Sequence, residues 1–234
     1  MAKTPLGRLD ARAFGMLELP RLAAEILEGF RTLGDLTGTT SDALDQCRIA
    51  AAVPGSILRA TDPGARLVGQ AITVLNRGRA AVSMAKSGLG EIEAHNLAEP
   101  GDVLVIQGVA GISSMGGVSA SVGRRQGEAG AIVDGAVRDI DHSRKIGYPV
   151  WCSSVSPITG KWRIQTVAVN QPVSIAGVAV RPGDLVIADE VGVCFVPFER
   201  AAEVLAVAQG LARREKERLE KLASGMPLKP WLES

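Results

Sequence analysis

Apolar positions and capping residues predict several helical segments along the chain. Residues 14–33 and 198–222 carry apolar residues at helical spacing, the first with a point of interruption at Pro20. The second is long and amphipathic. Residues 88–97 and 118–127 are also expected to be helical. A shorter helix should begin near Ser41, because Thr40-Ser41-Asp42 supplies N-cap side chains.

Short apolar runs bounded by turn residues predict the strands. They lie at residues 66–75, 103–106, 131–133, 149–152, 173–175, 178–180, 185–187 and 191–196. Strands and helices alternate in the middle of the chain, whereas the later part is rich in strands. This order favours a layered α/β/β fold with N- and C-terminal helices over a regular doubly wound sheet. No linker divides the chain, so residues 1–234 are expected to form one domain, with a core at about 41–197 and a C-terminal helix at about 198–223.

Composition narrows the classes of protein that this pattern can represent. Hydrophobic residues make up 46% and charged residues 22% of the 234 positions, so the chain can bury a substantial core. The formal net charge of +1 implies no basic face, so nucleic acid is not an expected partner. No apolar stretch is long enough to span a bilayer. Cys47, Cys152 and Cys194 form no CxxC pair, and this usage indicates a reducing cytoplasm.

A Gly- and Ser-rich loop precedes the helix expected at 118–127. It starts at Gly108 and leads into that helix through Gly116-Gly117-Val118-Ser119. Free backbone N–H groups at a helix start can hold an anion such as a carboxylate, aided by the helix dipole. Glycine also lets a ligand approach the backbone closely. Loops of this composition are common without a ligand, so the alternative interpretation is an ordinary connecting loop that binds no anion.

Adjacent Arg138 and Asp139 follow the strand expected at 131–133, where a second helix should begin. The carboxyl ends of strands are where α/β proteins place ligands. Arg138 offers a planar fork to a carboxylate or keto oxygen, and Asp139 offers a hard oxygen to Mg²⁺ or Mn²⁺. The pair is the candidate catalytic centre, with ordinary helix-start charges as the structural alternative.

The other ionisable residues of interest are isolated in the sequence. His142 lies three residues after Asp139 and can approach the same site, although an exposed or capping role is the more ordinary use of His142 and His95. A single histidine near the site does not indicate a zinc centre. Residues 189–190 are expected to form a turn between two strands. Glu215 is expected to be exposed on the last helix, unless that helix packs on another subunit.

Together these features resemble the RraA-like family, which includes 4-hydroxy-4-methyl-2-oxoglutarate aldolases. The resemblance runs from about Ser41 to Gly225. Residues 127–139, which end in Val133-Asp134-Gly135-Ala136-Val137-Arg138-Asp139, are its most specific part. The other matching segments are residues 41–45, 66–74, 100–105, 182–184 and 188–193.

The resemblance implies a swivelling-domain-like sandwich that assembles as a trimer or a dimer of trimers, with sites near subunit interfaces. It implies a divalent metal, usually Mg²⁺, held by Asp139 largely through waters. Arg138 would bind the pyruvate moiety of a small 2-oxo acid. The implied reaction is retro-aldol cleavage to pyruvate, with oxaloacetate decarboxylation as a side activity. The backbone amides implied to hold the substrate carboxylate are those of Gly116, Gly117, Val118 and Ser119.

One departure from the family concerns Gly117. Family aldolases carry an acidic residue where this chain has the second glycine of Gly116-Gly117, and that carboxylate is associated with positioning a water for proton transfer. Gly117 cannot do so. His142, Asp134 or a carboxylate from a neighbouring subunit can substitute, and Glu215 is the candidate that family position suggests for the neighbour's metal site.

Three functions therefore stay open at this stage. The first is a metal-dependent lyase that acts on a 2-oxo acid. The second is another enolate reaction on the same scaffold, such as decarboxylation or tautomerisation. The third is a regulator without catalysis, such as an RraA-type ribonuclease inhibitor. The Arg138-Asp139 pair favours an enzyme, and Gly117 weakens the case for the usual aldolase.

Overall fold

The fold is built on a large mixed sheet. A computed structural model describes residues 3–82, 84 and 87–225. Within these residues ten strands form one sheet, with the order β1-β12-β11-β3-β4-β6-β7-β2 and with β5 beside β6 and β8 beside β3. The strands of this sheet are β1 (Ala52–Pro54), β2 (Arg59–Ala60), β3 (Leu67–Gly78), β4 (Val103–Gln107), β5 (Ser113–Met115), β6 (Gly130–Val137), β7 (Val150–Val155), β8 (Ile164–Val169), β11 (Leu185–Ala188) and β12 (Gly192–Val196).

The parallel centre of the sheet is buried on both faces. Strands β3, β4, β6 and β7 pair in parallel, each with the next. Along β4, Val103 and Val105 enter one apolar cluster, whereas Leu104 and Ile106 enter another on the opposite face. A strand with apolar side chains on both faces needs covering layers on both sides.

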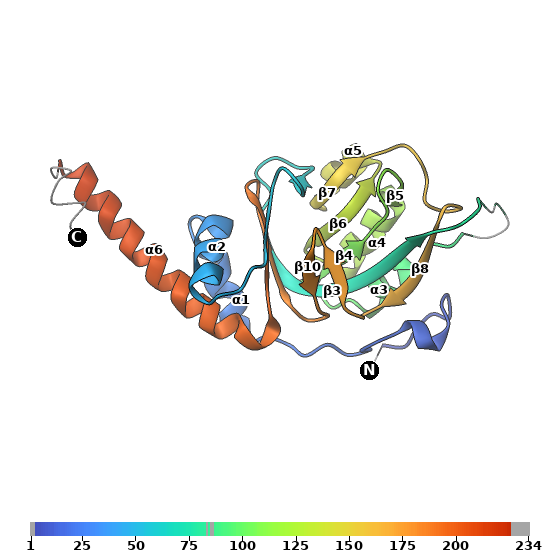
Figure 1. Ribbon diagram of the computed structural model, residues 1–234, viewed down its shortest axis with the longest axis horizontal. Helices are drawn as coiled ribbons and strands as arrows, with labels where there is room; N and C mark the ends of the chain where they lie inside the picture. Colours follow the sequence, from blue (N-terminus) through green and yellow to red (C-terminus); the bar gives the residue numbers. More distant parts are fainter. Residues whose placement is uncertain (1–2, 83, 85–86, 226–234) are drawn as a thin grey trace.

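Different elements cover the two faces (Figure 1). Helices α3, α4 and α5 lie on one face, and the hairpin of β9 (Val173–Ile175) and β10 (Val178–Val180) lies against β4 on the other. Helices α1, α2 and α6 gather beyond β12, and the C-terminal half of α6 projects away from the rest of the chain. The predicted mixed α/β fold is thus confirmed, as are the strands predicted at 173–175 and 178–180, which pair as a hairpin around Ala176-Gly177. The helices are α1 (Ala24–Arg31), α2 (Leu36–Gln46), α3 (Glu91–Leu97), α4 (Gly117–Gln126), α5 (Ile140–Lys145) and α6 (Ala201–Ala223).

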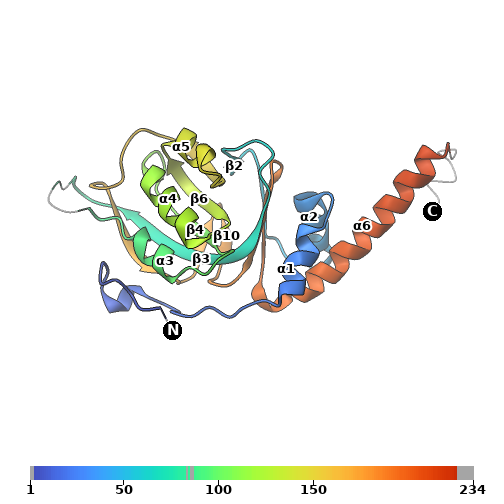
Figure 2. The same cartoon turned by 180° about the vertical axis from the view of Figure 1, so that it is seen from behind.

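The helix predicted over residues 14–33 is wrong in its first half. Only α1 is helical, and the preceding residues form an extended segment that passes along the sheet toward α3 (Figure 2). Its backbone groups find partners outside any helix. The Gly15 N–H donates to Val169 O, and the Leu22 N–H donates to Gln70 Oε1. Tertiary hydrogen bonds, together with Pro20, therefore outweigh the local helical spacing.

Two further boundaries differ from the prediction. Helix α2 begins at Leu36 instead of near Ser41, because Asp35 caps the Gly38 N–H. Strand β6 continues to Val137, beyond the end of the strand predicted at 131–133. Strand β8 was not predicted at all, because its sequence alternates too weakly to stand out.

Two of the three cysteines behave as small core residues. Cys152 and Cys194 are buried free thiols. Burial raises the pKa of Cys152 to about 11 and that of Cys194 to about 12, so both remain protonated at neutral pH.

No helix among the described residues is long and apolar enough to cross a membrane.

Candidate functional site

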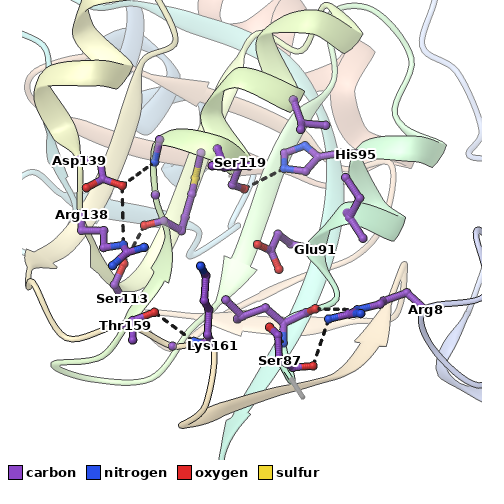
Figure 3. A pocket seen from close by; sticks show the side chains of 18 residues that line it. Arg8, Ser87, Glu91, His95, Ser113, Ser119, Arg138, Asp139, Thr159 and Lys161 are labelled. Carbon is purple, nitrogen blue, oxygen red and sulfur yellow. Dashed lines mark hydrogen bonds and ion pairs between the residues drawn. The ribbon is translucent and has the colours of Figure 1, made fainter. Parts of the chain in front are cut away.

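A cavity of about 370 Å³ opens where α4 begins, beside the end of β6. Figure 3 shows two walls that face each other across it. Arg138 and Asp139 lie on one wall, and Glu91, His95 and Ser119 lie on the other. The four residues predicted to hold an anion all line this cavity together with the Arg138-Asp139 pair. They are Gly116, Gly117, Val118 and Ser119.

The start of α4 offers backbone donors to the cavity. The first intrahelical bond runs from the Ala120 N–H to Gly116 O, at 3.0 Å. The N–H groups of Val118 and Ser119 precede it and have no intrahelical acceptor. The Gly117 N–H is already used, since it donates to Asp139 Oδ2 at 3.0 Å. The Val118 and Ser119 N–H groups are thus available to hold an anion, whereas the Gly117 N–H is not.

Glycine at position 116 is required by the packing around Asp139. A Cβ atom on Gly116 would lie 2.8 Å from Asp139 Oδ2 and 3.2 Å from Arg138 Cγ. Any side chain there would displace the carboxylate. The Gly-rich sequence therefore lets the backbone of α4 approach the Arg138-Asp139 pair closely.

Arg138 and Asp139 connect the end of β6 to α5. The Arg138 N–H donates to Met115 O, which ties the connection to β5. Asp139 has a positive φ of 56°, a left-handed conformation that costs about 1–2 kcal/mol for a non-glycine residue. Its Oδ2 lies 3.6 Å from Arg138 Nε, and its side chain is 49% exposed. A strained, half-exposed carboxylate at the end of a strand is a feature of functional sites.

The space beside Gly117 is partly filled by His142. A Cβ atom on Gly117 would lie 3.1 Å from His142 Cδ2 and 3.4 Å from Asp139 Cβ. His142 is exposed, as predicted, and its Nε2 lies 2.8 Å from Ser121 Oγ. His142 does not line the cavity, so it is adjacent to the site without facing its interior.

The opposite wall contains a buried network that the sequence analysis missed. His95 Nδ1 lies 2.8 Å from Glu128 Oε1, and His95 Nε2 lies 2.9 Å from Ser119 Oγ. The Tyr148 hydroxyl donates to Glu128 Oε2 at 2.6 Å. His95 is fully buried, so its predicted exposed or capping role is wrong. The bonds to α4 and to Glu128 explain its burial, since a buried imidazole needs partners for its ring nitrogens.

Glu91 is the second residue on this wall that the sequence analysis missed. It lines the cavity, and its Oε2 is buried with no hydrogen-bond partner. Burial, above all, raises the pKa of the Glu91 carboxyl. Glu91 and His95 are four residues apart on one face of α3, as Figure 3 shows. That spacing was the available signal, because two ionisable residues four positions apart lie on one face of a helix.

Four other residues considered in the sequence analysis lie apart from the cavity. Asp134 Oδ2 accepts from the Ala176 N–H of the β9–β10 turn, so Asp134 cannot take the role of a carboxylate at Gly117. The Asp189 and Glu190 carboxylates accept from backbone N–H groups, which confirms their role in a turn. Glu215 is exposed on the projecting part of α6 and does not line the cavity of its own chain.

The described residues contain no group of three or more His, Cys, Asp or Glu side chains that could enclose a metal ion. A hydrated Mg²⁺ ion does not require such a group, because it keeps several waters and uses one or two carboxylates. Asp139 fits that mode of binding. Its side chain is half exposed, and only Oδ2 is engaged by a backbone N–H.

The fold and the site define a mixed α/β protein with an anion-binding helix start beside an Arg-Asp pair. The family description RraA-like (aldolase/RraA) matches residues 37–195, and the chain belongs to this family. The chain is 31% identical over 148 residues to a putative 4-hydroxy-4-methyl-2-oxoglutarate aldolase of Halalkalibacterium halodurans. That match covers 62% of this chain and 70% of the relative.

Two further similarities extend beyond the aldolases. The chain is 29% identical to protein DlpA of Legionella pneumophila over 82% of its own length, but it spans only about a third of DlpA, 32%. Its structure is similar to that of RraAS2 of Streptomyces coelicolor, described as an unusual member of the RNase ES inhibitor RraA family. The TM-score is 0.73 with 28% identity, over 85% of this chain and 98% of RraAS2. The family thus includes proteins named for catalysis and for inhibition.

Proposed function

We propose that this chain is a divalent-metal-dependent lyase that cleaves a 4-hydroxy-2-oxo di- or tricarboxylic acid to pyruvate by a retro-aldol reaction. The observation that carries the proposal is the convergence of three groups on one cavity. They are the free N–H groups at the start of α4, the Arg138 guanidinium and the Asp139 carboxylate. The aldolase names of relatives support the same reaction class.

The substrate's pyruvate moiety would lie between α4 and Arg138. The Val118 and Ser119 N–H groups would hold its carboxylate, aided by the dipole of α4. The fork of Arg138 would donate to the 2-keto oxygen, where negative charge develops as the enolate forms. A preorganised donor at that oxygen lowers the barrier, because it binds the enolate more strongly than the neutral ketone.

Asp139 would hold the Mg²⁺ or Mn²⁺ ion. When bound, the ion would supply Lewis-acid stabilisation of the enolate charge. The bond from the Gly117 N–H to Oδ2 fixes the orientation of the carboxylate and couples it to the α4 start. Gly116 keeps that contact open, because a side chain there would meet Oδ2.

We further propose a homo-oligomer, a trimer or a dimer of trimers, in which α6 of one copy approaches the site of the next. The projecting half of α6 and the exposed Glu215 are compatible with this arrangement (Figure 1). Glu215 would then act on the neighbour's metal site. The same enolate chemistry would permit oxaloacetate decarboxylation or tautomerisation. These reactions are alternatives to the aldol cleavage, because Gly117 lacks the carboxylate that family aldolases carry at this position.

A non-catalytic ribonuclease regulator is the second candidate function. Its support is the structural similarity to RraAS2, which is described as belonging to an inhibitor family. Such a protein would act through surface contacts and would need no intact cavity. The two candidates therefore differ in whether the cavity residues matter.

The test is pyruvate release by the purified chain from oxaloacetate and from 4-carboxy-4-hydroxy-2-oxoadipate. Each substrate is supplied with Mg²⁺ or with an excess of chelator, and pyruvate is measured with a coupled dehydrogenase. We expect Mg²⁺-dependent pyruvate from at least one substrate. If neither substrate yields metal-dependent pyruvate, the lyase function is contradicted and the ribonuclease regulator is the remaining candidate.

A further inference from the structure

The unanswered chemical question at this site is which group moves the proton. Cleavage of a 4-hydroxy-2-oxo acid needs a base for the C4 hydroxyl and an acid for C3 of the enolate. The position where family aldolases carry a carboxylate is Gly117 here, and Asp134 is bound to the opposite face of the sheet. The group must therefore come from another part of the cavity wall.

Two carboxylates on α3 show the contrast that identifies a candidate. Glu93 is buried, and its oxygens accept from the backbone N–H groups of Leu6 and Arg8. Glu93 thus anchors the N-terminal segment. Glu91, on the cavity side of the same helix, has a buried Oε2 without any partner. A buried carboxyl oxygen without a partner lowers stability, so a structural role does not explain Glu91.

The other titratable groups near the cavity are already engaged. Both ring nitrogens of His95 have partners, Glu128 and Ser119, at 2.8 and 2.9 Å. Asp139 is held by the Gly117 N–H, and His142 lies outside the cavity beside Ser121. Among the described carboxylates and imidazoles that line the cavity, Glu91 alone has a buried oxygen free to meet a substrate.

The surroundings of Glu91 suit a group that alternates between its two protonation states. Its neighbours in the cavity are His95 on α3, Arg8 from the N-terminal segment and Lys161 from the loop before β8 (Figure 3). Burial raises the pKa of the Glu91 carboxyl, while its own backbone N–H, His95 and Arg8 favour its charged form. A carboxyl with a raised pKa is a more effective proton donor and acceptor near neutral pH.

We propose that Glu91 is the general acid–base residue of this site and replaces the carboxylate that is absent at Gly117. The inference rests on the proposed lyase function. The Glu91 carboxylate takes the proton of the C4 hydroxyl as the C3–C4 bond breaks. The electron pair of that bond passes into the pyruvate enolate, and C4 becomes a carbonyl. The protonated Glu91 then gives its proton to C3, which yields pyruvate and restores the carboxylate.

The test isolates the proton transfer from the cleavage. Glu91→Gln keeps the size and shape of the side chain but removes its acid–base function, and Glu99→Gln, in an exposed position just after α3, is the matched control. The wild type and both variants are incubated with pyruvate and Mg²⁺ in D₂O. Exchange of the C3 protons is followed by NMR, and oxalate affinity is measured by calorimetry as a probe of the binding half of the site.

We expect the Glu91→Gln exchange rate to fall by about 10²–10⁴-fold, the usual contribution of a general acid–base group, with oxalate affinity within about threefold of wild type. The Glu99→Gln variant should exchange at the wild-type rate. Exchange by Glu91→Gln at the wild-type rate would overturn the assignment, and so would a parallel loss of oxalate binding, which would indicate that Glu91 only shapes the cavity.

The outcome for Glu91 remains distinguishable from that of the lyase proposal. The wild-type chain could exchange the C3 protons of pyruvate but release no pyruvate from 4-carboxy-4-hydroxy-2-oxoadipate or from oxaloacetate. That result would contradict the lyase alone. A wild-type chain that releases pyruvate while Glu91→Gln keeps full exchange would contradict Glu91 alone. A wild type that shows neither activity contradicts both.

Discussion

The two walls of the cavity are built in opposite ways. Arg138 and Asp139 are 35% and 49% exposed, and backbone groups at the end of β6 and the start of α4 fix them. On the other wall, His95, Glu128 and Tyr148 are buried and hold one another through side-chain hydrogen bonds. The first wall can bind and release charged ligands at low desolvation cost, whereas the second keeps ionisable groups in a fixed, water-poor arrangement.

Among the variants that compare the two walls, the largest effect should come from the partly exposed wall of Arg138 and Asp139. Arg138→Ala is expected to lower kcat/KM for pyruvate release by about 10²–10³-fold, the usual cost of removing one donor to a developing oxyanion. Arg138→Lys should recover only part of this loss, because lysine keeps the charge but not the planar fork. Steady-state kinetics of the two variants tests this. Equal activity of Arg138→Lys and wild type would show that charge alone is needed.

The next effect concerns the stability of the buried wall. Tyr148→Phe removes the 2.6 Å bond to Glu128 Oε2 and should lower the free energy of unfolding by about 1–3 kcal/mol, because it leaves a buried acceptor without its donor. Urea unfolding monitored by circular dichroism measures the change. A loss below about 0.5 kcal/mol would mean that the network contributes little to this wall.

A matched pair of glycine variants tests the contact between α4 and Asp139. A Cβ at position 116 would meet Asp139 Oδ2 at 2.8 Å, whereas one at position 117 would meet His142 Cδ2 at 3.1 Å, in an exposed ring that can move. Gly116→Ala should therefore reduce activity about tenfold or more, as a displaced catalytic group does, and Gly117→Ala should have a smaller effect. Similar kcat/KM values for both variants would argue against this contact.

The smallest expected effect is a change in stability with pH. Because burial raises the pKa of Glu91, the folded chain retains a proton that the unfolded chain has released, and stability is lost as pH rises through the raised pKa. Glu91→Gln should therefore have a higher urea midpoint than wild type at neutral pH. The difference should shrink as pH falls toward the ordinary pKa of glutamate. Glu93→Gln, which weakens two backbone contacts, should lower the midpoint instead.

The wall formed by Arg138 and Asp139 was predictable from the sequence, whereas the buried network of His95, Glu128 and Tyr148 was not. Arg138 and Asp139 are adjacent in the sequence, follow an apolar strand and carry the most specific part of the family resemblance. His95, Ser119 and Glu128 are separated by 24 and 33 residues along the chain, counted from His95, and meet only because α3 packs beside α4. Their partnership depends on tertiary packing, which local patterns do not encode.

The same distinction explains the errors in the fold. The β9–β10 hairpin was predictable because its two-residue turn is local. The extended segment before α1 was not, since its backbone pairs with Val169, Asn170 and Gln70, all far away in the sequence. Helical spacing at residues 14–22 reflects contacts with the sheet and not a helix.

Pyruvate release by Asp139→Ala, compared with Asp141→Ala, tests the central claim most directly. Asp141 lies two residues further on α5, 94% exposed, and pairs only with Arg144 among the described residues, so it controls for the loss of a carboxylate. The account predicts that Asp139→Ala abolishes Mg²⁺-dependent pyruvate release, whereas Asp141→Ala retains it. Full metal-dependent release by a folded Asp139→Ala variant would contradict the metal and substrate site proposed here.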